Sequence, residues 1–260
     1  MQRSRRDFLK LAGVSALGLS AGTLGFLGEG AQAADALPSA ADFAKPAKAK
    51  QWGMVIDTAK FDDALFKKCI DACHDNHNVP KIEGKQEIKW IWTEDFEGSF
   101  PTERPAFLAE AQEHRKYLLL CNHCANPACT RVCPTKATFK NDEGLVIMDY
   151  HRCIGCRYCM AGCPYGARSF NFRDPGEFIA KDKLNLQYPH RTRGVVEKCT
   201  FCVEKLAQGK LPLCVEASGG AMVFGDLEDP KSEVRKVLKE KYAIRRKPDA
   251  GTDPSVFYIL

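Results

Sequence analysis

The chain has 260 residues, of which 45% are hydrophobic and 27% charged, the proportions of an ordinary globular protein of one or two domains. They exclude a collagen, a wholly disordered chain and a protein with many membrane spans. The formal net charge of +5 comes from dispersed Lys and Arg residues, so no nucleic-acid partner is expected. The 13 cysteines are unusually many, and their odd number excludes complete pairing into disulfides.

The N-terminus has the features of an export signal. Ser4–Lys10 contains a twin-Arg signature, which is followed by an apolar run and by an A-x-A cleavage motif at Ala31–Ala33. We therefore expect residues 1–33 to be a twin-Arg signal peptide and the folded part to be periplasmic. Retention of the signal as a membrane anchor stays open, since the apolar run is about long enough to span a bilayer. Residues 34–51, rich in Ala, Lys and Pro, are expected to be a linker.

The rest of the chain contains short predicted elements. In order they are a strand at 53–57, a helix at 62–75, a strand at 88–92, a helix at 106–114, a hairpin at 137–148, a strand at 221–224 and a helix at 232–241. With so few long apolar elements the hydrophobic core is expected to be small. Bound metal is then expected to supply much of the folding free energy.

Two cysteine runs have the spacing of bacterial ferredoxins. The second run in the chain is C-x2-C-x2-C-x3-C-P, and the first is the same run with two residues inserted before its third Cys. In such runs three thiolates of one loop hold one cubane, while the fourth ligates the neighbouring cluster. The spacing thus predicts one [4Fe-4S] cluster on Cys121, Cys124, Cys129 and Cys163, and another on Cys153, Cys156, Cys159 and Cys133. A zinc ribbon or disulfides are the alternatives, which the tight spacing and the two closing Cys-Pro pairs disfavour.

The five other cysteines form two incomplete groups. Ser218 stands where the last group would have its fourth Cys, and Asp63 and Phe66 stand at the first two positions of the earliest group. The same exchange of fourth ligands predicts a third cluster on Cys199, Cys202, Cys214 and Cys73. A fourth cluster would need positions 63, 66, 69 and 218, three of which are not Cys, so we expect it to be absent and Cys69 to be a spare thiol.

A covalent haem is the rival interpretation of the earliest group. The segment Cys69–His74 is one residue longer than the C-x-x-C-H attachment sequence. Haem attachment outside the cytoplasm needs an unfolded chain, whereas twin-Arg export suits a chain that folds around its cofactors first. Using Cys73 for haem would also leave the third cluster one ligand short, so the clusters are favoured.

Other chemistry is sparse. His123 and Arg157 lie inside the cluster loops and are candidates for tuning cluster potentials through hydrogen bonds or charge, with ordinary surface positions as the alternative. No His stands in a motif with a nearby carboxylate, so no catalytic residue is expected.

Residues 52–260 resemble a known family. The two complete runs, the segment Gly209–Cys214 before the last Cys, the segment Val223–Leu227 and the twin-Arg leader are similar to those of periplasmic polyferredoxin subunits of respiratory complexes, as in polysulfide, tetrathionate and formate-dependent nitrite reductase systems. The opening Trp52–Asp57 and the thinned earliest group most resemble the DsrO-type iron-sulfur subunits of DsrMKJOP complexes.

The predicted fold is α+β and loop-rich, with two bacterial-ferredoxin-like modules, one inserted in the other. The inner module is 115–175, with two clusters. The outer module is 52–114 with 176–226, with one cluster kept and one lost. Residues 227–260 are expected to form a C-terminal helix and a tail that contacts a partner.

The resemblance implies an electron-transfer subunit that is not itself an enzyme. Its three [4Fe-4S] clusters would carry electrons between a quinone-interacting NrfD-type integral membrane subunit and a multihaem cytochrome c subunit of a membrane-bound respiratory complex in sulfur or sulfite metabolism. One alternative is the relay subunit of a molybdopterin oxidoreductase of the polysulfide, tetrathionate or nitrite reductase type. Another is a structural iron-sulfur scaffold, which redox-silent clusters would support.

Overall fold

The computed structural model describes residues 48–103, 105 and 107–260. The predicted signal peptide, residues 1–33, and the linker as far as residue 47 lie outside the described residues. None of the helices in the described part is both long and apolar enough to cross a membrane.

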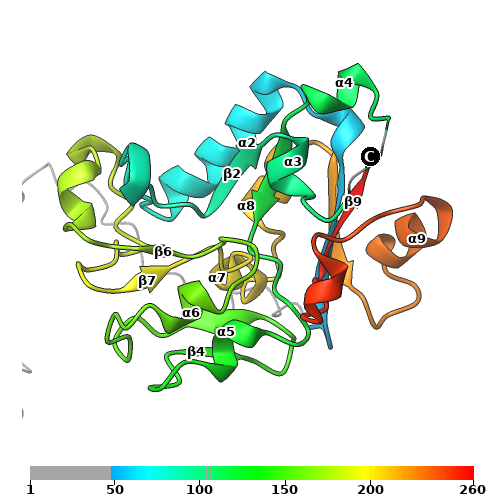
Figure 1. Cartoon of the computed structure of the whole chain (residues 1–260). Helices are drawn as coiled ribbons and strands as arrows, with labels where there is room; N and C mark the ends of the chain where they lie inside the picture. Colours follow the sequence, from blue (N-terminus) through cyan, green and yellow to red (C-terminus); the bar gives the residue numbers. More distant parts are fainter. Residues whose placement is uncertain (1–47, 104, 106) are drawn as a thin grey trace, which may run out of the picture. The chain divides into compact units, whose positions relative to one another are not determined.

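A three-stranded sheet joins the beginning and the end of this part of the chain (Figure 1). Its middle strand β1 (Trp52–Asp57) pairs antiparallel with β8 (Met222–Asp226) and parallel with β9 (Val256–Ile259). All six residues of β1 are buried, which suits a strand with neighbours on both edges. Helix α9 (Glu233–Glu240) packs against β8 and β1. The predicted strand at 53–57, the strand at 221–224 and the helix at 232–241 are thereby confirmed.

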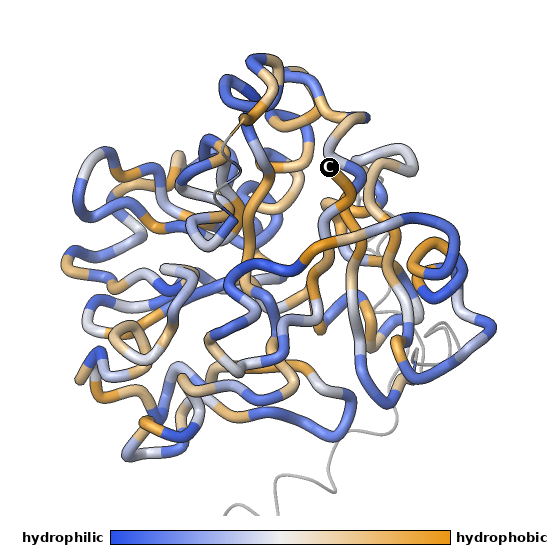
Figure 2. Tube along the Cα trace, turned by 45° about the vertical axis from the view of Figure 1, so that its right-hand side comes forward, coloured by the Kyte–Doolittle hydropathy of each residue, from blue (hydrophilic) through white to orange (hydrophobic). Residues whose placement is uncertain are grey.

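The C-terminal segment, expected to contact a partner, ends in strand β9 of this sheet. Val256 and Tyr258 are fully buried, and in Figure 2 the strand that reaches the C-terminal mark is hydrophobic. An apolar run of five residues fits either a docking tail or a buried strand of a sheet. Because the partner strand β1 lies about 200 residues earlier in the chain, no local pattern distinguishes the two.

The long helix α2 (Asp63–Asn76) confirms the helix predicted at 62–75. Asp62 caps it by accepting a hydrogen bond from the Leu65 N–H at 2.7 Å. Its buried residues Phe66, Cys69 and Cys73 face inward, and the helix packs against α8 (Leu213–Ala217).

Strand β2 (Ile91–Glu94) pairs antiparallel with β3 (Tyr117–Leu120). It begins three residues later than the strand predicted at 88–92. Trp90 lies outside the strand; its ring stacks on His77 and its indole N–H donates to Glu197. The helix predicted at 106–114 is confined to α4 (Glu110–Glu113), which follows a short α3 (Phe96–Ser99).

Short elements carry the cysteine loops. They are the predicted hairpin, formed by β4 (Thr138–Lys140) and β5 (Val146–Met148), the ribbon of β6 (Ser169–Phe170) and β7 (Val196–Glu197), and the helices α5 (Ala128–Arg131), α6 (Tyr158–Ala161) and α7 (Val203–Leu206). Single 3-10 turns lie at Thr58–Lys60, Gly84–Gln86, Pro175–Phe178, Lys181–Lys183 and Pro248–Ala250. This mixture of short helices and strands with long loops agrees with the predicted α+β class.

The buried core is larger than the sequence suggested. One continuous cluster of buried side chains extends from the central sheet through α2 and the β2–β3 ribbon to the cysteine loops, where it includes Cys121, Cys199 and Cys214. A second, small cluster consists of Met148, Cys159 and Val196. Hydrophobic burial is therefore strong around the sheet and α2 and weak around residues 148–160.

Candidate metal centres

The twelve predicted ligands fall into three sets. We call Cys121, Cys124, Cys129 and Cys163 site 1; Cys153, Cys156, Cys159 and Cys133 site 2; and Cys199, Cys202, Cys214 and Cys73 site 3. In the structure all of these thiols are free, and none is in a disulfide.

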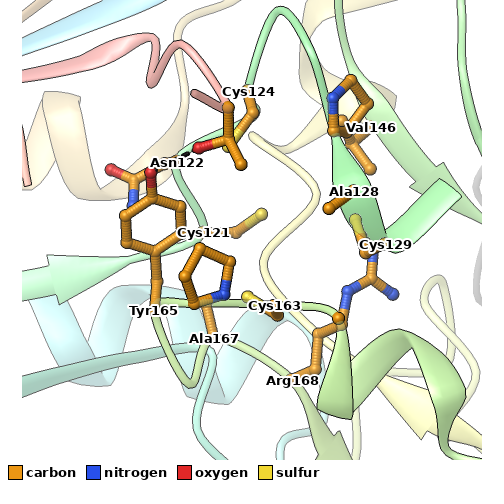
Figure 3. A pocket seen from close by; sticks show the side chains of 14 residues that line it. Cys121, Asn122, Cys124, Ala128, Cys129, Val146, Cys163, Tyr165, Ala167 and Arg168 are labelled. Carbon is orange, nitrogen blue, oxygen red and sulfur yellow. Dashed lines mark hydrogen bonds between the residues drawn. The ribbon is translucent and has the colours of Figure 1, made fainter. Parts of the chain in front are cut away.

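Site 1 is a cavity lined by all four of its predicted thiols (Figure 3). The space not filled by protein atoms is about 330 Å³. Cys121 directly follows β3, Cys129 lies in α5, and Cys163 comes from the other run, just after α6. Cys133, the fourth Cys of the first run, does not line this cavity. The structure thus joins three thiols of one run with the last thiol of the other.

Left-handed residues give the cysteine loops their tight curvature. His123 has φ 39° in the first run, and Gly155 and Arg157 have φ 71° and 62° in the second. A side chain at Gly155 would place its Cβ only 2.3 Å from the Gly194 carbonyl oxygen, so that position needs glycine. Each loop can therefore turn its thiols toward a common centre.

The thiols of site 1 are unsuited to remain as free thiolates. Burial, followed by the charge of neighbouring Cys121, raises the pKa of Cys124 to about 12, and the same two causes raise the pKa of Cys163. Without metal these groups are therefore neutral thiols, and a cation bound to all four sulfurs would convert them to the thiolates that ligate iron-sulfur clusters. The donor set and the cavity both fit a cubane.

Arg168 is a functional residue of site 1 that sequence reasoning missed. Its side chain is buried, and its guanidinium donates hydrogen bonds to the Sγ of Cys129 at 2.9 Å and to the Thr138 hydroxyl at 2.9 Å. Figure 3 shows this guanidinium beside Cys129. No spacing rule marks the residue; only its position, five residues after Cys163, could have drawn attention to it.

Site 2 lies at the surface. Cys159 is buried against Met148 and Val196, with Cys153 packed on the same cluster, whereas Cys156 is exposed. Cys133 lies in the turn after α5, and α5 packs against α6, which carries Cys159. Burial alone would raise the pKa of Cys133, but hydrogen bonds from the Thr138 backbone and neighbouring donors lower it below its ordinary value.

Site 3 is the most buried of the three. Its four cysteines are all buried, and the strongly raised pKa of Cys73 is caused first by burial and then by the charges of the other three thiols, in the order Cys202, Cys199 and Cys214. Phe201 and Cys202 have φ 55° and 50°, so this loop curves as the other two do. The structure therefore brings Cys73 of α2 to the loop that carries Cys199 and Cys202.

His77 and Glu204 flank site 3. Nδ1 of buried His77 lies 2.8 Å from the Cys73 carbonyl oxygen and 3.7 Å from the Cys73 Sγ, and its Nε2 lies 2.8 Å from a Glu204 carboxylate oxygen. One ligand atom each from His77, Cys202 and Glu204 lies within 4.8 Å of the others. No sequence motif links these residues, since 127 positions separate His77 from Glu204.

His123 lies between sites 1 and 3. Its Nδ1 accepts a hydrogen bond from the Val146 N–H at 3.1 Å, so its Nε2 carries the proton and donates to the Cys199 carbonyl oxygen at 3.1 Å. Burial, followed by the charge of Lys198, lowers its pKa far below the ordinary value, so the ring is neutral. It therefore ties two loops together and supplies no charge. Arg157, the other sequence candidate, is exposed and stacks over Phe170.

The positions expected to have lost a cluster form no ligand set. The Sγ of Cys69 lies 3.5 Å from the Cys214 carbonyl oxygen, and the Ser218 hydroxyl donates to the Val215 carbonyl oxygen. Phe66 is buried and stacks on Phe61, and Asp63 is exposed, 3.5 Å from the Lys116 ammonium. Burial raises the pKa of Cys69 to about 11, so it remains a thiol.

Comparison with known proteins gives one family match and several similar whole chains. A family model described as a 4Fe-4S dicluster domain matches residues 117–176. The Hdr-like menaquinol oxidoreductase iron-sulfur subunit 1 of Archaeoglobus fulgidus is 40% identical over 233 residues, covering 80% of this chain and 83% of the relative. The menaquinone reductase iron-sulfur cluster-binding subunit of Nitratidesulfovibrio vulgaris is 37% identical over 236 residues, covering 80% and 88%. The B component of the tetrathionate reductase of Salmonella typhimurium is 44% identical over 154 residues, covering 57% and 54%.

Proposed function

We propose that this chain, which belongs to the family of iron-sulfur electron-transfer subunits of respiratory oxidoreductases, conducts electrons through three [4Fe-4S] clusters at sites 1, 2 and 3. Like its relatives it is a relay subunit and not a catalytic one. The observation that carries the proposal is the cavity that gathers Cys121, Cys124, Cys129 and Cys163 from two separate runs.

The count of three clusters has two kinds of support. The dicluster domain matched at 117–176 accounts for sites 1 and 2. Site 3 adds four buried cysteines, of which Cys73 is close enough to the other three for their charges to raise its pKa. The sites are also neighbours: Cys121 of site 1 contributes to the raised pKa of Cys199 of site 3, and Cys129 of site 1 to that of Cys159 of site 2. The clusters would therefore form a row with site 1 in the middle.

The same arrangement supports two ferredoxin-like modules, one inserted in the other. Both boundaries of the dicluster match, 117–176, lie within two residues of those of the proposed inner module, 115–175. The outer module, 52–114 with 176–226, would contain site 3. The β2–β3 and β6–β7 ribbons each join a strand of one module to a strand of the other.

The location and partners follow from the N-terminal motif and the relatives. Export by the twin-Arg route would place the chain in the periplasm, associated with the membrane through its partners. Two relatives that cover most of this chain are named for menaquinol or menaquinone, which supports a quinone-interacting NrfD-type membrane subunit as one partner. A multihaem cytochrome c is the proposed second partner, as in DsrO-type systems of sulfur metabolism.

A second candidate is the relay subunit of a molybdopterin oxidoreductase. Similarity to the B components of tetrathionate reductase and of the polysulfide reductase of Wolinella succinogenes favours it. The first of these matches covers 57% of this chain and the second covers 81%, against 80% for each of the two quinone-linked relatives, so the extent of the match does not separate the two candidates.

Purification of the native complex distinguishes these proposals. Three clusters predict about twelve irons and twelve sulfides per chain, with four of each in a cubane. Mass spectrometry identifies the other subunits, a haem spectrum reports a cytochrome, and molybdenum analysis reports a molybdopterin enzyme. About eight or sixteen irons would refute the three-cluster assignment, and molybdenum in the complex would favour the second candidate.

A further inference from the structure

Two buried cations lie among the cluster sites without carboxylate partners. The side chains of Arg168 and Lys198 are 4% and 0% exposed. Among residues 48–103, 105 and 107–260, neither forms an ion pair with an acidic side chain. Arg191 shows the usual alternative, because this equally buried guanidinium lies 2.6 Å from a Glu197 carboxylate oxygen. A buried charge normally needs such compensation.

Arg168 lies where sites 1 and 2 meet. Its guanidinium is 2.9 Å from the Sγ of Cys129, a site 1 thiol, and its charge also acts on Cys159, a site 2 thiol. The negative partner of this cation is therefore the ligand sulfur itself.

Lys198 lies where sites 1 and 3 meet. Its ammonium donates to the carbonyl oxygens of Val146 and, at 2.7 Å, of Cys199. Val146 lines the cavity of site 1, whereas Cys199 belongs to site 3. Site 1 is thus flanked by a buried cation on both of the sides that face another cluster.

The surroundings of the other two sites weaken the effect of these charges. Site 2 has the exposed ligand Cys156, so water screens the charges near it. Site 3 has the acidic side chain of Glu204 within 4.8 Å of the Cys202 Sγ.

We propose that Arg168 and Lys198 make site 1 the cluster of highest potential, so that an electron entering the chain rests at the middle of the row. This inference depends on the proposed function, in which clusters occupy all three sites. A cubane with four thiolates carries about −2 when oxidised and gains one further negative charge on reduction, so a buried cation stabilises the reduced form more. A reduced partner, such as a quinol or a haem, supplies the single electron, and the next acceptor removes it.

The test is a reductive titration of the full-length holoprotein, purified without air and followed by electron paramagnetic resonance. Arg168→Gln and Lys198→Met each remove one cation and keep most of its volume. We expect the signal of highest potential to respond to both substitutions, each lowering its ratio of reduced to oxidised cluster about tenfold at a fixed potential, or 59 mV for one electron. Arg168→Gln should also affect site 2, and Lys198→Met site 3, but only site 1 should respond to both.

Two further variants separate charge from structure. Arg168→Lys keeps the positive charge and should retain a potential close to that of the natural protein. Lys140→Gln removes a cation whose ammonium contacts the Ala125 carbonyl oxygen next to Cys124, but which is exposed to water and should therefore shift nothing.

The outcomes are distinct. If the iron content is unchanged and no single signal responds to both Arg168→Gln and Lys198→Met, the inference is overturned. Loss of iron from both Arg168→Gln and Arg168→Lys would likewise overturn it, because Arg168 would then be a structural residue. About eight irons in the unmodified protein would refute the three-cluster proposal separately, and the double response of site 1 could still be measured.

Discussion

The earliest cysteine group and the two complete runs share one spacing frame but differ in backbone. In the complete runs a four-residue helix begins just before the third Cys, at Ala128 and at Tyr158, and loop residues of positive φ precede that Cys. In the earliest group α2 begins at Asp63, so positions 63, 66 and 69 follow one another along a helix. No residue from 48 to 77 has a positive φ.

The comparison shows that the earliest group lacks the loop as well as the ligands. Three thiolates can surround a cubane from a curved loop, whereas positions 63, 66 and 69 extend over two turns of a straight helix. Phe66 supplies apolar contact there by stacking on Phe61, with ring centroids 5.0 Å apart. Ser218 satisfies its own hydroxyl and accepts a hydrogen bond from the Met222 N–H. In the earliest group, ring stacking and hydrogen bonds occupy the positions that the spacing frame would give to ligands.

Removal of iron should produce the largest difference between the cysteine runs and the rest of the fold. Without clusters, residues 121–165 have only four-residue helices, a small hairpin and few buried apolar side chains, so we expect their amides to lose protection from hydrogen exchange. The sheet β8-β1-β9 and α2 should retain more protection. Peptide-resolved exchange on chelated and intact protein measures this difference, and uniform loss over the chain would contradict it.

Substitution of single cysteines should distinguish the ligands from the spare thiol among the thirteen cysteines by their effect on iron content. Cys163→Ser should remove about four of about twelve irons, and Cys73→Ser should likewise remove the cluster of site 3. Cys69→Ser is the matched control and should leave the iron content and spectra unchanged. Equal loss from Cys69→Ser and Cys73→Ser would favour the covalent haem instead, which a pyridine haemochrome assay detects directly.

Truncation of Phe66, which stands at a ligand position of the spacing frame, should destabilise the protein around the earliest cysteine group. Phe66→Ala removes a buried aromatic ring, and such changes cost about 3 to 5 kcal/mol of unfolding free energy. Urea unfolding of the holoprotein without air gives the value. Phe107→Ala is the control, because Phe107 is 97% exposed and its loss should change stability by less than about 0.5 kcal/mol. Similar costs at both positions would contradict the role given to Phe66.

Ser218→Ala should have a smaller effect in the same experiment. The Met222 N–H then loses its acceptor in a buried place, which costs about 1 to 3 kcal/mol. The exposed Thr102→Ala serves as the control. An unchanged unfolding free energy for Ser218→Ala would show that the hydrogen bond contributes nothing there.

Restoring the ligands alone should have the least effect. Asp63→Cys, Phe66→Cys and Ser218→Cys together complete the frame with Cys69, yet α2 should still hold three of these positions along a helix. We therefore expect the iron content to remain at about twelve per chain. A rise to about sixteen would show that a cluster can reshape the start of α2, and that the missing ligands were the whole difference.

The sequence predicted features that depend on local spacing. The cavity lined by Cys121, Cys124, Cys129 and Cys163 is consistent with the predicted exchange of fourth ligands, which stays a prediction, and capping by Asp62 fits the predicted start of α2. It failed where partners are distant in the chain. The start of β2 depends on its pairing with β3, β9 on its pairing with β1, and Arg168 on a thiol 39 residues away. Such contacts depend on the fold and leave no periodic pattern in the sequence.

The exposure of Cys156 makes the protein's tolerance of oxygen uneven. Thiolate ligands that contact solvent are the ones that dissolved oxidants meet first, and oxidation beyond sulfenic acid is irreversible for such a ligand. Sites 1 and 3 have no fully exposed thiol. With clusters at the three proposed sites, brief aeration should therefore damage the cluster of site 2 first and leave those of sites 1 and 3 intact.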